Sequence, residues 1–200
     1  MPEHPASDGT AALYIALHHH ADQRANEAAE HNVSPSPSPS PSPITVLHIS
    51  AAHCVLVSGS TAENGMTRVV SGGSLSVPTL YFRQTPPDEG DLERAIEHVE
   101  DAVMPERPQL APHSQLYSAD PTIRQMALLT GQTAAPNMQL SLDEVEALFN
   151  RLAARASGRP VSQDSELPAD AGFAATLLIL REYMQHLGFA TLKICPDTLV

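Results

Sequence analysis

Apolar side chains recur at helical spacing after Ser141. Leucine, valine and phenylalanine fall every three or four residues up to the break at Gly158 and Pro160, which predicts an amphipathic helix. The start of this segment, Ser141 to Glu144, has the spacing of a capping box, in which the serine accepts from the glutamate amide and the glutamate reaches back. We therefore expect the helix to begin directly after Ser141.

A second apolar run covers more than one helical face. It starts near Asp170 and reaches Leu187, so we expect a helix that is buried on two sides. Gly188 is a natural left-handed terminator, and Thr191–Cys195 is predicted as a short strand closed by Pro196. A buried helix that leads into a strand needs a sheet to pack on, and that sheet has to come from earlier in the chain.

Three short segments between residues 44 and 70 supply the first part of that sheet. Ile44–Ile49 and His53–Val57 flank the small-residue turn Ser50-Ala51-Ala52, which predicts a hairpin. After a turn at Glu63-Asn64-Gly65, Thr67–Val70 is expected as a third strand. Three successive antiparallel strands form a meander.

Helices and strands alternate after the meander. We expect a helix from about Glu89 to the break at Pro105, and then a strand at Gln115–Ser118. A further helix is predicted to begin at Pro121, with Asp120 as its cap.

The segment between the meander and these helices is less regular. Ser74–Phe82 contains Pro78 and is not assigned to an element. Ser71–Ser74 is interpreted as a flexible turn and not as a phosphate cradle, because no helix is expected to follow it.

The first 43 residues differ in composition from the rest. Met1–Thr10 is expected to be disordered, and Ala11–His31 is an Ala- and His-rich helical segment. Ser34–Pro43 consists of five Ser-Pro pairs, which exclude a helix or a central strand and predict an extended linker. The predicted organisation is a tail and helix at 1–33, a linker at 34–43 and one domain at 44–200.

Composition and charge narrow the function classes. The 200 residues are 42% hydrophobic, enough for one core, and the net charge of −12 argues against a nucleic-acid partner. No apolar run approaches the about 18 residues of a membrane span, and no signal peptide is recognised. We expect a cytoplasmic protein with two reduced, largely buried thiols, Cys54 and Cys195. The pairs His18/Asp22 and Glu27/His31 share helix faces, yet ordinary solvated residues are the favoured interpretation.

Several segments resemble one known family. His48–Leu56 lies in the frame of a hairpin that reads roughly D-I-G-G-G-S-T-E-L in that family, and Ser74–Phe82 lies in the frame of S-L-P-L-G-A-V-R-L. Asp120-Pro121-Thr122 stands where the family has G-G-T, and Pro168 to Cys195 resembles its closing helix and strand. From Ile44 to Val200 the chain therefore resembles the second half of the exopolyphosphatase / guanosine pentaphosphate phosphatase (Ppx/GppA) family. This resemblance implies an α/β fold, the ribonuclease H-like half of an actin/Hsp70-type ATPase fold.

The departures from the family fall at its phosphate contacts. Glycines in phosphate loops let backbone amides approach the anion, whereas this chain has side chains at Ser50, Ala51 and Ala52. The residues carried over as phosphate-binding candidates are Ser50, Ala51, Ala52, Asp120 and Thr122. His48 and His53 are the candidates for a metal, although ordinary strand residues are the preferred interpretation. We expect no catalytic residue and no cofactor, with magnesium required only if the chain is catalytic.

Three functional hypotheses follow from these departures. The favoured one is a non-catalytic binding or regulatory module derived from the phosphatase family. The second is an active phosphohydrolase of polyphosphate or guanosine pentaphosphate with a remodelled site. The third is a structural or interaction protein, or a truncated gene remnant. The expected partners are a phosphate-containing small molecule and a protein, including a second copy that pairs with the exposed edge of the meander.

Overall fold

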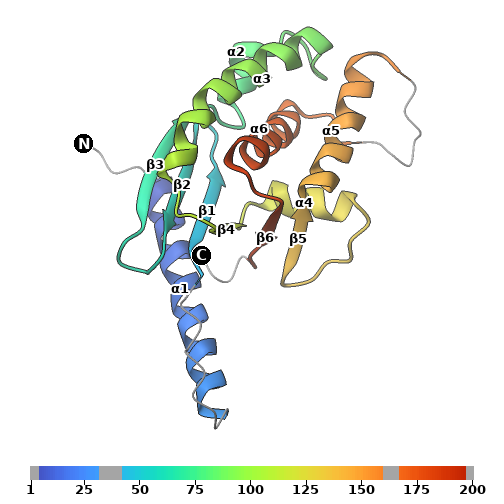
Figure 1. Ribbon diagram of the computed structural model, residues 1–200. Coiled ribbons are helices and arrows are strands. Elements are labelled where there is room, and N and C mark those ends of the chain that lie inside the picture. Colours follow the sequence, from blue (N-terminus) through green and yellow to red (C-terminus); the bar gives the residue numbers. More distant parts are fainter. Residues whose placement is uncertain (1–4, 32–41, 160–166, 197–200) are drawn as a thin grey trace.

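The sheet contains six strands in the order β3-β2-β1-β4-β6-β5. The protein is described by a computed structural model, which covers residues 5–31, 42–159 and 167–196 (Figure 1). The meander consists of β1 (Ile44–Ile49), β2 (His53–Gly59) and β3 (Met66–Ser71). The other half consists of β4 (Gln115–Ser118), β5 (Met138–Ser141) and β6 (Thr191–Ile194).

Strand β1 joins the two halves of the sheet. It pairs antiparallel with β2, Ile49 opposite Cys54, and parallel with β4, Ile44 opposite Gln115. Strand β4 in turn pairs parallel with β6. The predicted meander and the predicted C-terminal strand therefore lie in one sheet, and the predicted α/β fold class is confirmed.

Helices cover one face of this sheet (Figure 1). They are α2 (Ser76–Tyr81), α3 (Glu89–Val103), α4 (Pro121–Leu129), α5 (Leu142–Ala156) and α6 (Ala171–Leu187), and the short 3-10 helix η1 (Met104–Gln109) follows α3. Their apolar stripes join the inward side chains of the strands, among them Leu47, Leu116 and Leu192, in one core. Alternation along the strands thus sends every second side chain toward the helices.

The helix ends follow the sequence closely. Ser141 and Glu144 form the predicted capping box, with the Ser141 amide donating to the glutamate over 2.7 Å. The Asp170 carboxylate accepts from the Phe173 amide at the start of α6, and Gly188 ends that helix at φ 82°. Twelve of the 17 residues of α6 are buried, which confirms the expected two-sided burial.

Helix α1 (Pro5–His31) packs on the opposite face of the sheet (Figure 1). Tyr14 is 1% exposed and donates to the Thr61 carbonyl over 2.7 Å. Gly59 and Gly65 leave the space for its ring, since a Cβ on either would come within 2.6 Å of Tyr14 atoms. The helix begins six residues before the predicted Ala11, so the expectation of disorder is wrong for residues 5–10.

Three elements were not expected from the sequence: the 3-10 helix η1, helix α2 and strand β5. Helix α2 follows Gly73 almost directly, so the expectation that no helix follows Ser71–Ser74 is wrong. Pro78 is tolerated because it occupies the first turn of α2, where an amide has no partner within the helix. Strand β5 is four residues long and pairs antiparallel with β6, and so short a segment leaves little pattern to recognise.

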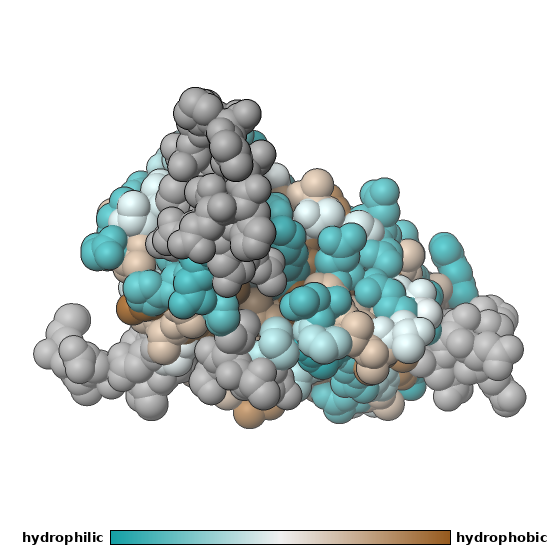
Figure 2. Space-filling model, turned by 90° about the horizontal axis from the view of Figure 1, so that it is seen from below, coloured by the Kyte–Doolittle hydropathy of each residue, from teal (hydrophilic) through white to brown (hydrophobic). Residues whose placement is uncertain are grey.

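The surface is polar on the side seen in Figure 2. Hydrophilic residues cover most of the coloured atoms there, and hydrophobic residues show only in small separate areas. Two of the most exposed large apolar side chains, Leu75 and Leu80, instead belong to α2 and its cap, at 60% and 68% exposure. Among the described helices, none has both the length and the apolar character needed to cross a bilayer.

Replacement of Tyr14 by alanine tests how α1 is held. The buried ring and its hydrogen bond are lost, and we expect the free energy of unfolding to fall by about 3 kcal/mol or more. Ile15→Ala on the same helix is the control, because Ile15 is 42% exposed and should change stability by about 0.5 kcal/mol at most. Urea denaturation compares the two variants, and equal losses would contradict this docking.

Candidate functional site

The C-terminal ends of the three parallel strands meet at one edge of the sheet. The turn Ser50–Ala52 follows β1, Asp120 follows β4 by two residues, and Cys195 follows β6. Ligands of open α/β sheets bind at this kind of edge, beyond the carboxyl ends of the strands. The structure thus brings the predicted residues Ser50, Ala51, Ala52 and Asp120 to one edge.

Asp120 ties the ends of β1 and β4 together. One carboxylate oxygen accepts the Ile49 amide over 2.8 Å, and the other contacts Nδ1 of His48. The Asp120 side chain is 10% exposed and that of His48 is 37% exposed. The hydrogen bond that His48 makes to the Asp120 carboxylate raises the pKa of His48 above its ordinary value, although partial burial opposes this.

The prediction that the Asp120 side chain caps α4 is wrong, although the residue does occupy the cap position. Pro121 begins that helix as expected. The Asp120 carboxylate, however, makes no capping bond to the described residues of α4. The carboxylate turns to β1 because a histidine and a free strand amide are available there.

The turn after β1 is closed from within. The Ser50 carbonyl accepts from the Ser74 amide over 2.9 Å. The Ala51 carbonyl accepts from the amides of Leu75 and Ser76 over 2.9 and 3.0 Å, and the Ser76 hydroxyl donates to the Ala52 carbonyl over 3.0 Å. The backbone amides at the start of α2 therefore donate to carbonyls of the turn.

Close backbone contact makes this arrangement possible. A Cβ on Gly73 would come within 2.5 Å of the Ser50 carbonyl oxygen and 2.6 Å of the His53 nitrogen. The Ser50 hydroxyl donates to the His53 carbonyl over 2.7 Å and accepts from the His53 amide over 3.2 Å. Gly73 is thus needed to bring the two segments together.

Little donor capacity is left at the turn. Ala51 and Ala52 are exposed, and within the described part of the chain neither of their amides donates a hydrogen bond. The Leu75 amide donates to the Ala51 carbonyl, which places the exposed Leu75 side chain beside the turn. The turn therefore offers two adjacent amides beside the exposed Leu75 side chain.

Of the remaining predicted residues, Thr122 lies apart from these contacts, whereas His53 takes part in them through its backbone bonds to Ser50. Thr122 is half-buried in the first turn of α4, and His53 is half-buried at the start of β2. Both cysteines are buried free thiols, as expected. Burial raises the pKa of Cys54 to about 12 and that of Cys195 to about 11, so neither is a thiolate nucleophile at neutral pH.

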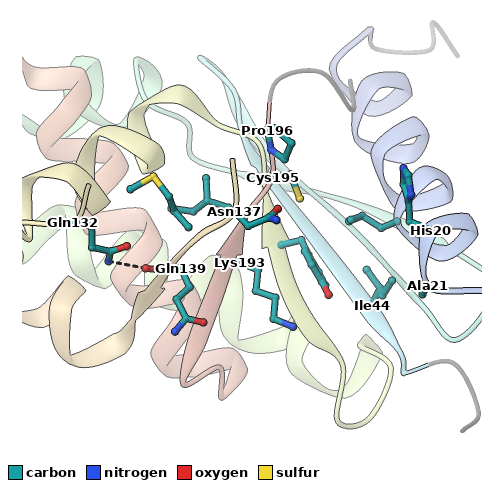
Figure 3. Close-up of a pocket in the computed structure, with 13 residues that line it drawn as sticks. His20, Ala21, Ile44, Gln132, Asn137, Gln139, Lys193, Cys195 and Pro196 are labelled. Carbon is teal, nitrogen blue, oxygen red and sulfur yellow. Dashed lines mark hydrogen bonds between the residues drawn. The ribbon is translucent and has the colours of Figure 1, made fainter. Parts of the chain in front are cut away.

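A cavity of about 670 Å³ lies on the other face of the sheet, beside α1 (Figure 3). Its walls come from α1, β1, β4, β6 and the segment around β5, and they contain none of the residues predicted as phosphate or metal ligands. Polar lining residues include His20, Tyr117, Gln139 and Lys193. The Lys193 ammonium lies 5.5 Å from the centre of the Tyr117 ring.

Sequence reasoning missed this cavity, although a signal was present. Tyr117 and Lys193 occupy positions that alternate with the buried Leu116 and Leu192, so they point away from the helical core. Because β4 and β6 are adjacent and in register at Tyr117 and Lys193, these outward side chains meet. That neighbourhood depends on strand order, which no local pattern of the sequence contains.

Asp120→Asn tests the ion pair at the sheet edge through its pH dependence. A raised folded-state pKa of His48 stabilises the protein fully below its unfolded value of about 6.5, and this contribution is lost as pH rises through the folded pKa. Asp120→Asn should therefore lower the melting temperature more at acidic than at alkaline pH. In a His48→Gln background this difference should vanish, and a pH-independent loss in both backgrounds would contradict the pair.

No protein-family profile and no curated protein sequence matches the chain. Several solved structures, however, match the fold of the chain. The Ppx/GppA phosphatase of Aquifex aeolicus, in its type II variant, matches with a TM-score of 0.65 at 13% identity, over 95% of this chain and 59% of its own. An exopolyphosphatase from Cytophaga hutchinsonii matches with a TM-score of 0.64 at 12% identity, over 95% and 60%.

These matches extend beyond the segment that carried the sequence resemblance. Residues 44–200 make up less than four fifths of the chain, so a coverage of 95% includes part of the N-terminal segment as well. The chain spans about three fifths of the length of these relatives. Its sheet order, its helices and these matches together show that the chain has a Ppx/GppA-like fold.

Proposed function

We propose that this protein is a non-catalytic binding or regulatory module built on a Ppx/GppA-like fold. The observation that carries the proposal is the closed turn: the carbonyls of Ser50 and Ala51 accept the amides of Ser74, Leu75 and Ser76. Donors that would otherwise face an anion are thereby bonded inside the chain.

Phosphoryl transfer needs donors and metal where negative charge develops. Asp120, the buried carboxylate at this edge, already has both oxygens bonded, to His48 and to the Ile49 amide. An additional phosphate beside Asp120 would meet negative charge, and a magnesium ion would have to displace His48. The charge and donor pattern of the edge therefore oppose hydrolysis of a phosphoanhydride.

The same edge suits a protein partner. Ala51, Ala52, Leu75 and Leu80 are exposed around the closed turn and α2, and apolar side chains gathered at an edge are typical of interaction surfaces. The two amides at Ala51 and Ala52 are the place where a phosphate-containing small molecule would bind.

A phosphate-release assay tests the absence of catalysis. The pure protein should release no phosphate from polyphosphate or guanosine pentaphosphate above buffer, with magnesium present or absent. The contradicting outcome is magnesium-dependent release that Asp120→Ala abolishes.

A melting-temperature screen tests binding. We expect polyphosphate or inorganic phosphate to raise the melting temperature of the wild type, since a ligand of the folded state stabilises it by mass action. Ala51→Pro removes one of the two amides and should abolish the rise in melting temperature. Thr79→Ala, on the exposed side of α2, is the control and should keep the shift.

One observation favours a remodelled phosphohydrolase as a second candidate. Nδ1 of His48 is held by Asp120, and within the described residues its other ring nitrogen makes no hydrogen bond. A histidine oriented in this way is a suitable general base. Phosphate release that His48→Gln abolishes, and that does not need magnesium, would support this candidate over the first.

A further inference from the structure

A histidine and two glutamates converge between α3 and α6, in a part of the molecule that the proposed function does not use. Glu182 and His186 lie one turn apart on α6, with 3.1 Å between Oε2 and Nε2. Glu100 of α3 brings its Oε1 to 3.8 Å from the same nitrogen. One atom from each side chain can be chosen so that all three lie within 4.8 Å of one another.

These separations are close to those of ligands around one cation. Metal bonds of about 2.0–2.2 Å to nitrogen and oxygen place neighbouring ligand atoms about 3–3.5 Å apart. The Glu182–His186 separation is already in this range. Glu100 has a side chain that is 42% exposed, so it is free to shorten the remaining gap by a small rotation.

The glutamate on α6 is oriented by a second layer of contacts. Arg181 donates to Oε1 of Glu182 over 2.5 Å and to Glu146 of α5 over 3.0 Å. The bond from Arg181 holds the Glu182 carboxylate so that its Oε2 faces His186. Metal ligands in proteins are oriented by outer contacts of the same kind.

The local charge balance also calls for a cation. The Glu182 side chain is 2% exposed and contacts both Arg181 and His186. Glu146 and Glu182 share the positive charge of Arg181, and the only ion-pair contact of Glu100 among the described residues is with His186. A buried carboxylate is costly unless it is paired or coordinates a metal.

We propose that Glu100, Glu182 and His186 bind a first-row divalent transition cation, with zinc as the ion to be tested. The imidazole nitrogen selects such an ion over magnesium, which prefers oxygen ligands alone. Three protein ligands leave the further coordination positions to water. The bound ion would join α3 to α6, the buried helix against which α3 packs.

Calorimetric titration with zinc chloride at about pH 7.5, where histidine is neutral, tests the site. The wild type should bind one zinc ion that is lost, or weakened more than about tenfold, in His186→Gln and in Glu100→Gln. Glu100→Gln keeps the test informative if the histidine variant folds poorly, because Glu100 lies at the surface. Glu97→Gln, an exposed glutamate on the same helix, is the matched control and should bind as the wild type does.

Histidines elsewhere on the chain provide the competing explanation. His19 and His20 are exposed on α1, and zinc bound there would be unaffected by Glu100→Gln. Zinc binding that survives both variants, or no binding in the wild type, would overturn the proposal. In that case Glu100, Glu182 and His186 form only an ion-paired contact between two helices.

Discussion

The structure depends on the burial of α6 between the sheet and its neighbouring helices. Its apolar side chains share one core with inward side chains of β1, β4 and β6. The helix also packs against α3 and α5. A helix with apolar side chains on several faces has no stable place at a surface. It therefore requires both a sheet wide enough to cover it and helices that flank it.

Much of this architecture follows from local signals. The strand Ile44–Ile49, the strand at Gln115–Ser118 and the capping box at Ser141 lie where the sequence predicts them, because each combines a strong pattern with clear ends. Helix α2 and strand β5 were missed since each is at most six residues long. Their stability comes from partners distant in sequence: the turn at Ser50 for α2, and β6 for β5.

The candidate site shows a different limit. The sequence shows side chains instead of glycines at Ser50, Ala51 and Ala52, but it does not show which groups bond to the nearby amides. Only the folded chain shows that Ser74 and Leu75 donate to the turn and that Asp120 pairs with His48. Whether a donor at this edge faces a ligand or a carbonyl depends on contacts between residues 24 or more positions apart in the sequence. A local sequence motif does not contain this information.

The space that Gly59 and Gly65 leave for the Tyr14 ring bears on the order in which the chain folds during synthesis. The tyrosine and its Thr61 acceptor are 47 positions apart, so α1 leaves the ribosome well before the β2–β3 hairpin exists. An isolated helix is marginal in water without a surface to pack on. During translation the Tyr14 hydroxyl therefore has no Thr61 acceptor until the loop between β2 and β3 has been made, so this contact forms late.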